Sequence, residues 1–366
     1  MSDSIPLLSP FKLGDLELKN RIAMAPMTRS RAGEIRVANE LMAEYYEQRS
    51  SAGMIITEAT TISEQANGWQ NTPGIYNEEQ ISGWKKVTSR LQAKGTPIFL
   101  QLWHTGRAGH SYFQRNGELP VAPSAIKLEG DPVHTAEGKK DHEIPRALLE
   151  SEIPSIVNDY KKSAANAKTA GFDGVEIHAA NGYLIDQFLQ SRTNKRTDGY
   201  GGSIEKRYRL LKEVVEAVCS VYPSQRVGVR LSPNSSFGDM GSADNHEAFL
   251  YFAKELDQYN LGFLHVLRVP KDFIPFHGLG KEVQLLEWRE VYSGTILVNG
   301  GYGSVAEAQS AIDAGEADLI AIGRPFITNP DLIERMTNGL PLASWQDTSV
   351  FYGFDRHNYT DFPFYE

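Results

Sequence analysis

The chain has 366 residues, of which 41% are hydrophobic and 23% are charged, a composition typical of a folded globular protein rather than a disordered chain or a coiled coil. Its formal net charge of −9 disfavours general binding of nucleic acid, because an acidic surface repels phosphodiester backbones. The single cysteine, Cys219, excludes an intramolecular disulfide, a cysteine-rich zinc site and an iron–sulfur cluster. We interpret it as a core residue, because it lies in a helix-like apolar stripe.

No targeting or membrane segment is expected. The N-terminus has neither a basic start nor a long apolar run, and nowhere do 18 apolar residues follow one another. The sequence therefore predicts a cytoplasmic protein that binds neither membrane nor nucleic acid.

Short apolar runs alternate with longer amphipathic segments along the chain. Strands are expected at residues 21–26, 54–59, 97–103, 174–179, 226–231, 262–267, 295–299 and 318–323. Runs this short, rich in β-branched residues and nearly continuous are typical of parallel strands buried on both faces. Helices are expected at residues 80–94, 152–169, 204–221, 245–259, 305–314 and 330–338, from apolar residues three and four apart and from helix start and stop signals.

Eight strands, each followed by a further segment, predict a (β/α)8 TIM barrel, with a doubly wound open sheet as the alternative. We expect a single domain spanning residues 1–366. Two segments are not part of the predicted barrel. They are a Gly-, Pro- and charge-rich insertion after the third strand (104–149) and a Tyr- and Phe-rich C-terminal tail (340–366). Because long insertions after barrel strands usually cover the active-site mouth, we expect the first segment to cap it.

The ends of the last two strands predict a phosphate site. Asn299-Gly-Gly-Tyr-Gly303 precedes a predicted helix, so its small residues expose backbone N–H groups beside a positive helix end. Arg324, after the eighth strand, can add a bidentate contact. The loops after strands seven and eight are the usual phosphate site of this fold. Ordinary turn glycines and a surface arginine are the alternative.

A ligand anchored by its phosphate would extend across the barrel mouth. Thr28, Gln101, His178 and Arg230 offer hydrogen-bond donors there, with few carboxylates among them. A cationic Arg230 beside a ring would stabilise negative charge developing on that ring, which suits a reduced flavin better than a metal ion. We expect no metal site.

The fourth strand is followed closely by His178, Asn181 and Tyr183. The first two could hold one substrate oxygen by two hydrogen bonds. The tyrosine could donate a proton, because its usual pKa near 10 keeps it protonated. A core histidine, an Asn-Gly turn and a packed tyrosine are the alternative.

The chain resembles the Old Yellow Enzyme family of FMN-dependent ene-reductases from about Leu8 to Pro363. The resemblance rests on residues 20–30 (NRIAMAPMTRS), 101–107 (QLWHTGR), 178–188 (HAANGYLIDQF) and 191–202 (SRTNKRTDGYGG), and on Tyr352 followed by residues 359–363 (YTDFP). Thr28 stands where the thermophilic-like branch carries Cys, and Asn181 where some relatives carry a second His. Both indicate the bacterial branch similar to pentaerythritol tetranitrate reductase and morphinone reductase.

This resemblance implies that FMN binds noncovalently over the barrel mouth. Thr28 would bond a flavin carbonyl oxygen, and Arg230 would lie near the N1 edge of the ring. The implied cofactor-binding residues are Pro26, Met27, Thr28, Ala59, Gln101, His178, Arg230, Gly300, Gly301, Gly323, Arg324 and Tyr352.

The resemblance also implies the reaction. NADPH would reduce the flavin, which would pass hydride to the β-carbon of an α,β-unsaturated ketone, aldehyde, imide or nitroalkene. The implied catalytic residues are His178 and Asn181, which would bind the substrate oxygen, and Tyr183, which would protonate the α-carbon. Phenols would bind as inhibitors, and the protein would be a monomer or a weak homodimer.

The same resemblance places Trp69, Trp103 and Tyr352 around the substrate pocket. Trp69 stands where many relatives carry Tyr, which would alter pocket size. Packing in the core is the alternative for Trp103 and Tyr352. The basic stretch 192–198 is interpreted as a solvated face, with a share in binding the NADPH phosphates as the alternative.

Two other functions are compatible with parts of the sequence. A phosphate-binding barrel lyase or isomerase would need a central lysine or carboxylate pair, and Lys271 is a candidate lysine. A flavin carrier or light sensor without turnover would have no need of His178, Asn181 and Tyr183.

Overall fold

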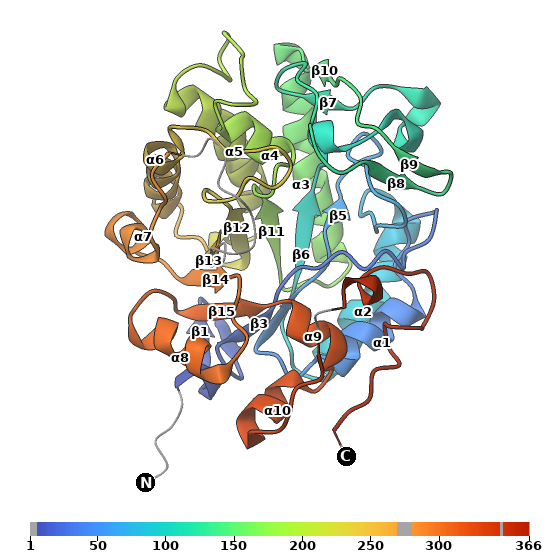
Figure 1. Ribbon diagram of the computed structural model, residues 1–366, viewed down its shortest axis with the longest axis vertical. Coiled ribbons are helices and arrows are strands. Elements are labelled where there is room, and N and C mark those ends of the chain that lie inside the picture. The colour runs from blue at the N-terminus through green and yellow to red at the C-terminus, as the bar shows by residue number, and fades with distance from the viewer. Residues whose placement is uncertain (1–5, 269–279, 345–346, 366) are drawn as a thin grey trace.

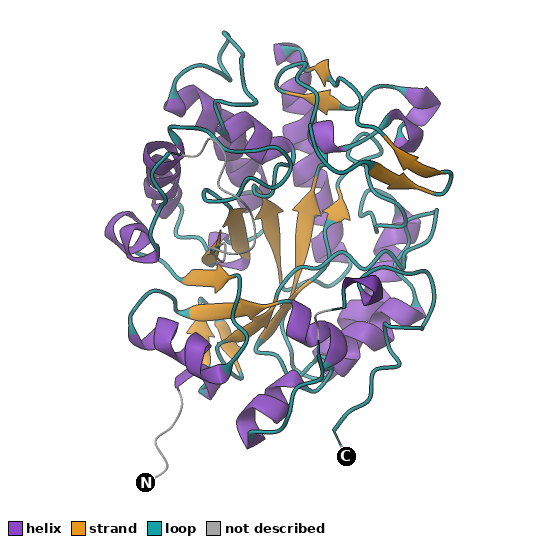
Figure 2. Cartoon of the chain, viewed as in Figure 1, coloured by secondary structure: helices purple, strands orange, loops and turns teal. Residues whose placement is uncertain are grey.

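The computed structural model describes residues 6–268, 280–344 and 347–365. Within these ranges, eight parallel strands form a barrel surrounded by helices (Figures 1 and 2). In order around the barrel they are β3 (Ile22–Met24), β4 (Met54–Ile56), β6 (Ile98–Trp103), β11 (Gly174–His178), β12 (Val227–Leu231), β13 (Phe263–Leu267), β14 (Ile296–Asn299) and β15 (Leu319–Ile322). Pairing of β15 with β3 and of β6 with β11 closes the ring. The predicted TIM barrel is confirmed, and the open sheet is wrong.

The predicted helices are present with small shifts at their ends. They are α2 (Glu78–Ala93), α3 (Ile153–Thr169), α5 (Ile204–Cys219), α6 (Asn245–Asp257), α8 (Val305–Asp313) and α10 (Leu332–Asn338). The described ranges also contain four α-helices that were not predicted: α1 (Glu40–Gln48), α4 (Leu184–Leu189), α7 (Leu285–Val291) and α9 (Arg324–Thr328). Helix α1 has a clear start signal, since the Asn39 side chain accepts a hydrogen bond from the Met42 amide. The other three have at most seven residues, too few for a periodic pattern.

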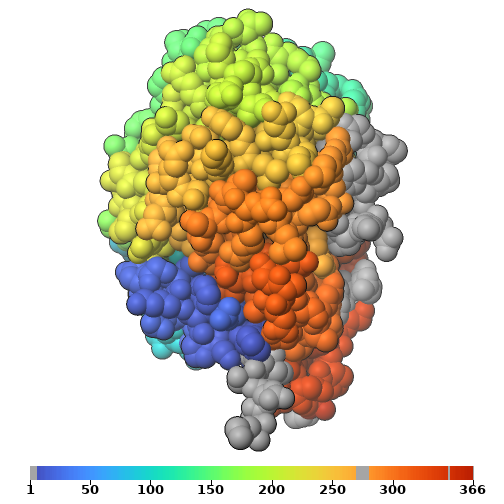
Figure 3. Space-filling model, turned by 90° about the vertical axis from the view of Figure 1, so that its left-hand side faces the viewer, coloured from blue at the N-terminus to red at the C-terminus, as the bar shows by residue number. Residues whose placement is uncertain are grey.

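Side chains alternate between two apolar cores along most of the barrel strands. On β6, Leu100 and Leu102 belong to the large cluster between barrel and helices, whereas Phe99 belongs to the cluster inside the barrel. A hairpin of β1 (Phe11–Leu13) and β2 (Leu16–Leu18) adds Leu13 and Leu18 to the inner cluster. In Figure 3 the N-terminal segment that carries it, in blue, lies at the lower end of the molecule. Apolar side chains therefore fill the amino end of the barrel, and its polar residues gather toward the other end.

The insertion after β6 forms a small cap of its own. It contains the antiparallel pair β8 (Val133–Thr135) and β9 (Gly138–Lys140), and the parallel pair β7 (Val121–Ala122) and β10 (Arg146–Ala147). Figure 1 shows these strands beyond the carboxyl end of β6, as expected for a capping insertion. In the described ranges, no helix combines the length and apolarity that crossing a membrane requires.

Candidate functional site

Two cavities adjoin at the carboxyl ends of the barrel strands. The first, here called the strand-end cavity, has a volume of about 470 Å³ and lies between the ends of β3, β12, β14 and β15. The second, the lid cavity, has about 850 Å³ and is walled in part by the insertion. Asn181, Phe237 and Tyr352 line both. Both volumes are within the range of small-molecule sites, so one ligand in each cavity could meet the other at the shared residues.

A glycine turn forms one end of the strand-end cavity. Gly300 has φ +121°, and a Cβ there would lie 1.7 Å from the carbonyl oxygen of Arg268. Gly301 follows with φ +76°. The Arg268 guanidinium also donates to the Gly300 carbonyl at 3.0 Å, which holds the turn in place. Only glycine fits this close approach, and the turn brings backbone to the cavity wall beside Arg324.

The start of α8 differs from the sequence expectation. Ser304 Oγ accepts from the Glu307 amide at 3.2 Å, and the Gly303 amide donates to Glu307 Oε2 at 3.2 Å. Glu307 also accepts from Arg268. The helix end thus already faces a carboxylate of its own chain. The glycine turn and Arg324, rather than the end of α8, are therefore the groups suited to an anion.

Arg230 lies at the inner wall of the strand-end cavity. It donates from Nη2 to Asn299 Oδ1 at 2.9 Å, and burial lowers its pKa while the charge of Glu176 opposes that fall. Within the described residues, Arg230 Nε and His178 Nδ1 are buried and lack hydrogen-bond partners. Because Arg230 lines the strand-end cavity, its unpartnered Nε–H is suited to donate to a ligand bound there. A ring with hydrogen-bonding edges and a phosphate tail, as in FMN, fits this cavity.

A tight turn after β11 positions Asn181 and Tyr183. Asn181 and Gly182 both adopt left-handed conformations, with φ +59° and +74°. Their amides donate to Ser232 Oγ and Asp186 Oδ2, both at 2.8 Å. The chain then enters α4, and the side chains of Asn181 and Tyr183 reach the lid cavity.

Burial gives His178 and Tyr183 complementary protonation states. It lowers the pKa of His178 well below its usual value, with help from the charge of Arg230, so the imidazole is neutral. It raises the pKa of the Tyr183 hydroxyl, so the phenol stays protonated. The Tyr183 ring meets that of Trp103 edge-on, with centroids 4.9 Å apart. The site can thus present a neutral imidazole and a protonated phenol together.

Glu58 supports the segment that carries Thr28. Its Oε2 accepts hydrogen bonds from the Arg29 and Ser30 amides at 3.1 and 3.3 Å, and burial raises the pKa of this carboxyl to about 7. Sequence reasoning missed Glu58. Its place at the end of the second predicted strand, residues 54–59, is the signal that could have found it.

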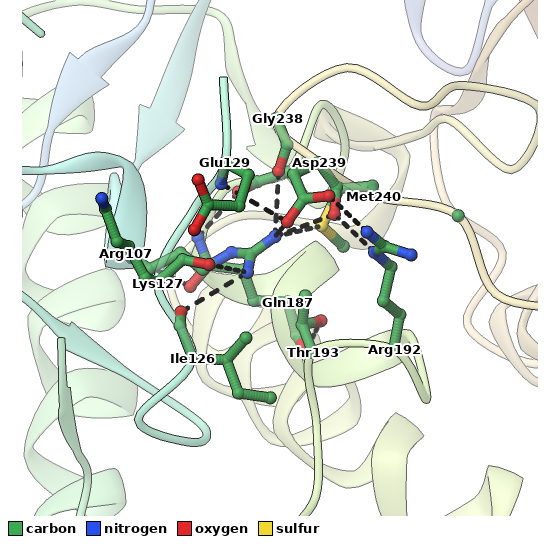
Figure 4. A network of polar contacts seen from close by, with 12 residues as sticks. Arg107, Ile126, Lys127, Glu129, Gln187, Arg192, Thr193, Gly238, Asp239 and Met240 are labelled. Carbon is green, nitrogen blue, oxygen red and sulfur yellow. Dashed lines mark hydrogen bonds and ion pairs between the residues drawn. The ribbon is translucent and has the colours of Figure 1, made fainter. Parts of the chain in front are cut away.

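The walls of the lid cavity are joined by an arginine. Arg107, fully buried, donates to backbone carbonyls of Ile126 and Lys127 in the insertion and of Gly238 and Asp239 after β12 (Figure 4). Asp239 also accepts from Arg192 at 2.5 Å. One side chain thereby fixes the insertion to the loop opposite.

The basic stretch 192–198 is less solvated than expected. The Arg196 side chain is only 7% exposed, pairs with Asp198 at 2.5 Å and donates to the Leu148 carbonyl. The interpretation as a solvated face is therefore wrong for Arg196. Arg192 is half exposed and lines the lid cavity, although part of its charge is balanced by Asp239.

The structure brings most of the predicted site residues to the two cavities. Pro26, Met27, Arg230, Gly300, Gly301, Gly323 and Arg324 line the strand-end cavity, Trp69 and Tyr183 line the lid cavity, and Asn181 and Tyr352 line both. Thr28, Ala59, Gln101, His178 and Trp103 line neither, and all of these but Thr28 are buried. The rings of Trp69 and Tyr352 lie 6.2 Å apart.

Other lining residues were not predicted. The loop at residues 235–240 contributes to both cavities, and residues 128–134 of the insertion line the lid cavity. The first follows a strand end and contains glycine, a signal that strand-end reasoning could have used. Lys271 lies outside the described residues. Among the residues that the structure describes, no group of three His, Cys, Asp or Glu side chains could hold a metal ion.

Fold and site together define a TIM barrel with two adjoining cavities at the carboxyl ends of its strands. The family model for the NADH:flavin oxidoreductase / NADH oxidase family matches residues 6–343. The chain is 41% identical to 12-oxophytodienoate reductase 1 of Oryza sativa subsp. japonica, over 99% of this chain and 94% of that one. A structure of morphinone reductase in complex with tetrahydroNAD is 45% identical, with a TM-score of 0.91 over 98% of both chains.

A further structure, the old yellow enzyme homologue from Zymomonas mobilis, has a TM-score of 0.93 and 43% identity over 98% of this chain and 99% of that one. The chain belongs to the FMN-dependent NADH:flavin oxidoreductase family, which includes Old Yellow Enzyme. The resemblance found in its sequence is thereby confirmed.

Proposed function

We propose that this protein is an ene-reductase that uses FMN and NADPH to reduce activated C=C bonds, with residues 1–366 acting as one domain. The observation that carries the proposal is the position of Tyr183, whose ring meets that of His178 edge-on and which lines the lid cavity together with Asn181, a residue shared with the strand-end cavity. Substrates would be α,β-unsaturated ketones, aldehydes, imides and nitroalkenes.

The strand-end cavity would hold FMN. Arg324 and the turn at Gly300 and Gly301 would bind the phosphate, because a guanidinium and backbone N–H groups match its oxygens. Arg230 would face the ring edge that becomes more negative on reduction. Pro26 and Met27 would contact the ring. Bound FMN would supply the hydride that passes from the coenzyme to the β-carbon of the substrate.

The lid cavity would hold the substrate and, in turn, the nicotinamide. His178 and Asn181 would each donate a hydrogen bond to the substrate oxygen, drawing electrons from the alkene so that its β-carbon accepts hydride. Tyr183 would give its hydroxyl proton to the α-carbon, which completes the addition of one hydride and one proton. The phenolate would recover a proton from solvent. Trp69, Tyr352 and the insertion would limit access of water.

An absorbance titration tests this proposal. The purified protein should show a flavin spectrum that bleaches with NADPH under anaerobic conditions and returns on addition of 2-cyclohexenone. A spectrum that bleaches and does not return would contradict the proposed substrate class. Protein that stays colourless after FMN is added would contradict the proposal as a whole. Parallel titrations with NADH would decide the coenzyme.

A further inference from the structure

A layer of buried polar side chains lies inside the barrel. Glu176 on β11 accepts a hydrogen bond from Gln101 Nε2 on β6 at 2.7 Å through Oε1. Its Oε2 lies 2.6 Å from His265 Nδ1 on β13. All three residues are at most 1% exposed. Neither Glu176 nor His265 has a part in the proposed reaction, yet a buried carboxyl is costly unless it is well paired.

The strand register places this layer next to the residues of the mouth. Gln101 pairs with Glu176 across β6 and β11. Arg230 pairs with His178 on one side and with His265 on the other. The charge of Glu176 raises the pKa of Arg230, and burial lowers that of His265. Glu176 is therefore electrostatically coupled to the cation of the strand-end cavity.

Glu176 also fixes the orientation of both partners. A carboxylate only accepts hydrogen bonds, so the NH₂ group of Gln101, not its oxygen, must face it. The Gln101 oxygen and its second N–H are then left for other partners. For the same reason His265 must carry its proton on Nδ1.

We propose that Glu176 is a positioning residue that orients Gln101 for the cofactor ring and, through its negative charge, lowers the reduction potential of the bound FMN. This inference rests on the proposed function. Reduction adds negative charge to the flavin beside Arg230. A carboxylate close to that arginine offsets part of its positive field, so the reduced state is less favoured than with Arg230 alone.

The test compares Glu176→Gln with Glu213→Gln in the holoenzyme. Glu213 on α5 is also doubly hydrogen-bonded, by Tyr200 and Arg209, but lies outside the barrel. Glu176→Gln should favour reduced FMN by about tenfold or more, which is about 30 mV for a two-electron couple. It should also weaken FMN binding. The amide of the variant can turn its NH₂ group toward Gln101, so it no longer fixes the orientation of that side chain. Glu213→Gln should change neither quantity.

Several outcomes would overturn the inference. The role of the charge is contradicted if Glu176→Gln changes the equilibrium ratio of reduced to oxidised FMN by less than threefold. It is also contradicted if the variant lowers the reduction potential. Unchanged FMN affinity contradicts the role in orienting Gln101. Wild-type protein that binds no FMN contradicts the proposed function itself, so the two failures are distinguishable.

A second measurement needs no variant and applies if Glu176→Gln does not fold. Nitrogen-15 spectra of the wild-type holoenzyme at pH 8 should show His265 as the neutral Nδ1–H tautomer. An Nε2–H tautomer would overturn the arrangement.

Discussion

The ring of Tyr183 meets the ring of His178 edge-on, with centroids 5.1 Å apart and planes at 72°. Five positions of chain separate the two residues, and the left-handed turn at Asn181 and Gly182 folds them together. Burial acts on them in opposite senses, since it raises the pKa of the phenol and lowers that of the imidazole. The pair therefore combines a proton donor with a neutral hydrogen-bonding group near neutral pH.

Replacing Tyr183 by Phe should separate the two halves of the proposed reaction. The ring would keep its edge contacts with Trp103 and His178, so the pocket should keep its shape. Reduction of FMN by NADPH should proceed as before. Reoxidation by 2-cyclohexenone should slow by roughly 100- to 10,000-fold, the usual contribution of general acid catalysis. Stopped-flow absorbance measures each half alone.

Tyr112→Phe is the matched control, because Tyr112 is an exposed tyrosine of the insertion outside both cavities. If both half-reactions slow equally in Tyr183→Phe, the hydroxyl is not the proton donor.

Replacing His178 by Ala should weaken the binding of phenols, whose oxygen resembles that of the reduced substrate. Loss of a hydrogen bond to a charged oxygen costs about 1.5–3 kcal/mol, which is roughly 10- to 100-fold in affinity. Because the pKa of His178 lies well below its usual value, the difference between wild type and variant should not vary from pH 6 to 8. Spectral titration of the flavin with a phenol gives both affinities.

His246→Ala provides the control for this variant, since His246 pairs with Glu287 among the outer helices. Equal phenol affinity in His178→Ala and wild type would refute the oxygen-binding role.

The sequence predicted the barrel and much of the site because both follow from local patterns. Apolar runs mark strands buried on both faces, and the residues after them necessarily gather at one end of a parallel barrel. Pro26, Arg230 and Arg324 could be placed on that basis alone. The roles given to His178 and Tyr183 rest on their residue types after the fourth strand and on the family resemblance, and they stay predictions.

What the sequence did not reveal depends on contacts between distant segments. Nothing local to Arg107 indicates that it joins the insertion to residues 238–239. The pairing of Glu176 with His265 requires the register of three strands, and no periodicity supplies that. Ser304 and Glu307 form an ordinary helix start, so their effect on the predicted phosphate site emerges only from geometry.

Replacing Arg324 by Ala should reduce affinity for FMN without affecting riboflavin, which lacks the phosphate. A charge-assisted contact of this kind is worth about 1.5–3 kcal/mol, so FMN should bind roughly 10- to 100-fold more weakly. Fluorescence quenching on titration of the apoprotein measures both ligands. Arg146→Ala, which removes an exposed arginine paired with Glu152, should leave both affinities unchanged. An equal loss for FMN and riboflavin would show that Arg324 supports the fold rather than the phosphate.

Ionisation of the Glu58 carboxyl should lower the free energy of unfolding as pH rises from about 4.5 to about 7. This carboxyl is protonated in the native state up to about pH 7, whereas in the unfolded chain it ionises near its usual value of 4.5. Between these values the unfolded state binds fewer protons, so the free energy of unfolding falls with pH, by about 3 kcal/mol in total, and levels off above pH 7.

Glu58→Gln removes this ionisation and keeps a side-chain oxygen for the Arg29 and Ser30 amides. Its free energy of unfolding, relative to wild type, should therefore be higher by up to about 3 kcal/mol at pH 8 than at pH 4.5. Asp186, whose pKa burial also raises to about 7, adds the same background slope to both proteins and cancels in the difference. Urea denaturation at a fixed FMN concentration measures the difference in free energy of unfolding between variant and wild type. Glu34→Gln on the surface is the control. A difference that stays constant with pH would mean that Glu58 is ionised in the native state, held by the two amides despite its burial.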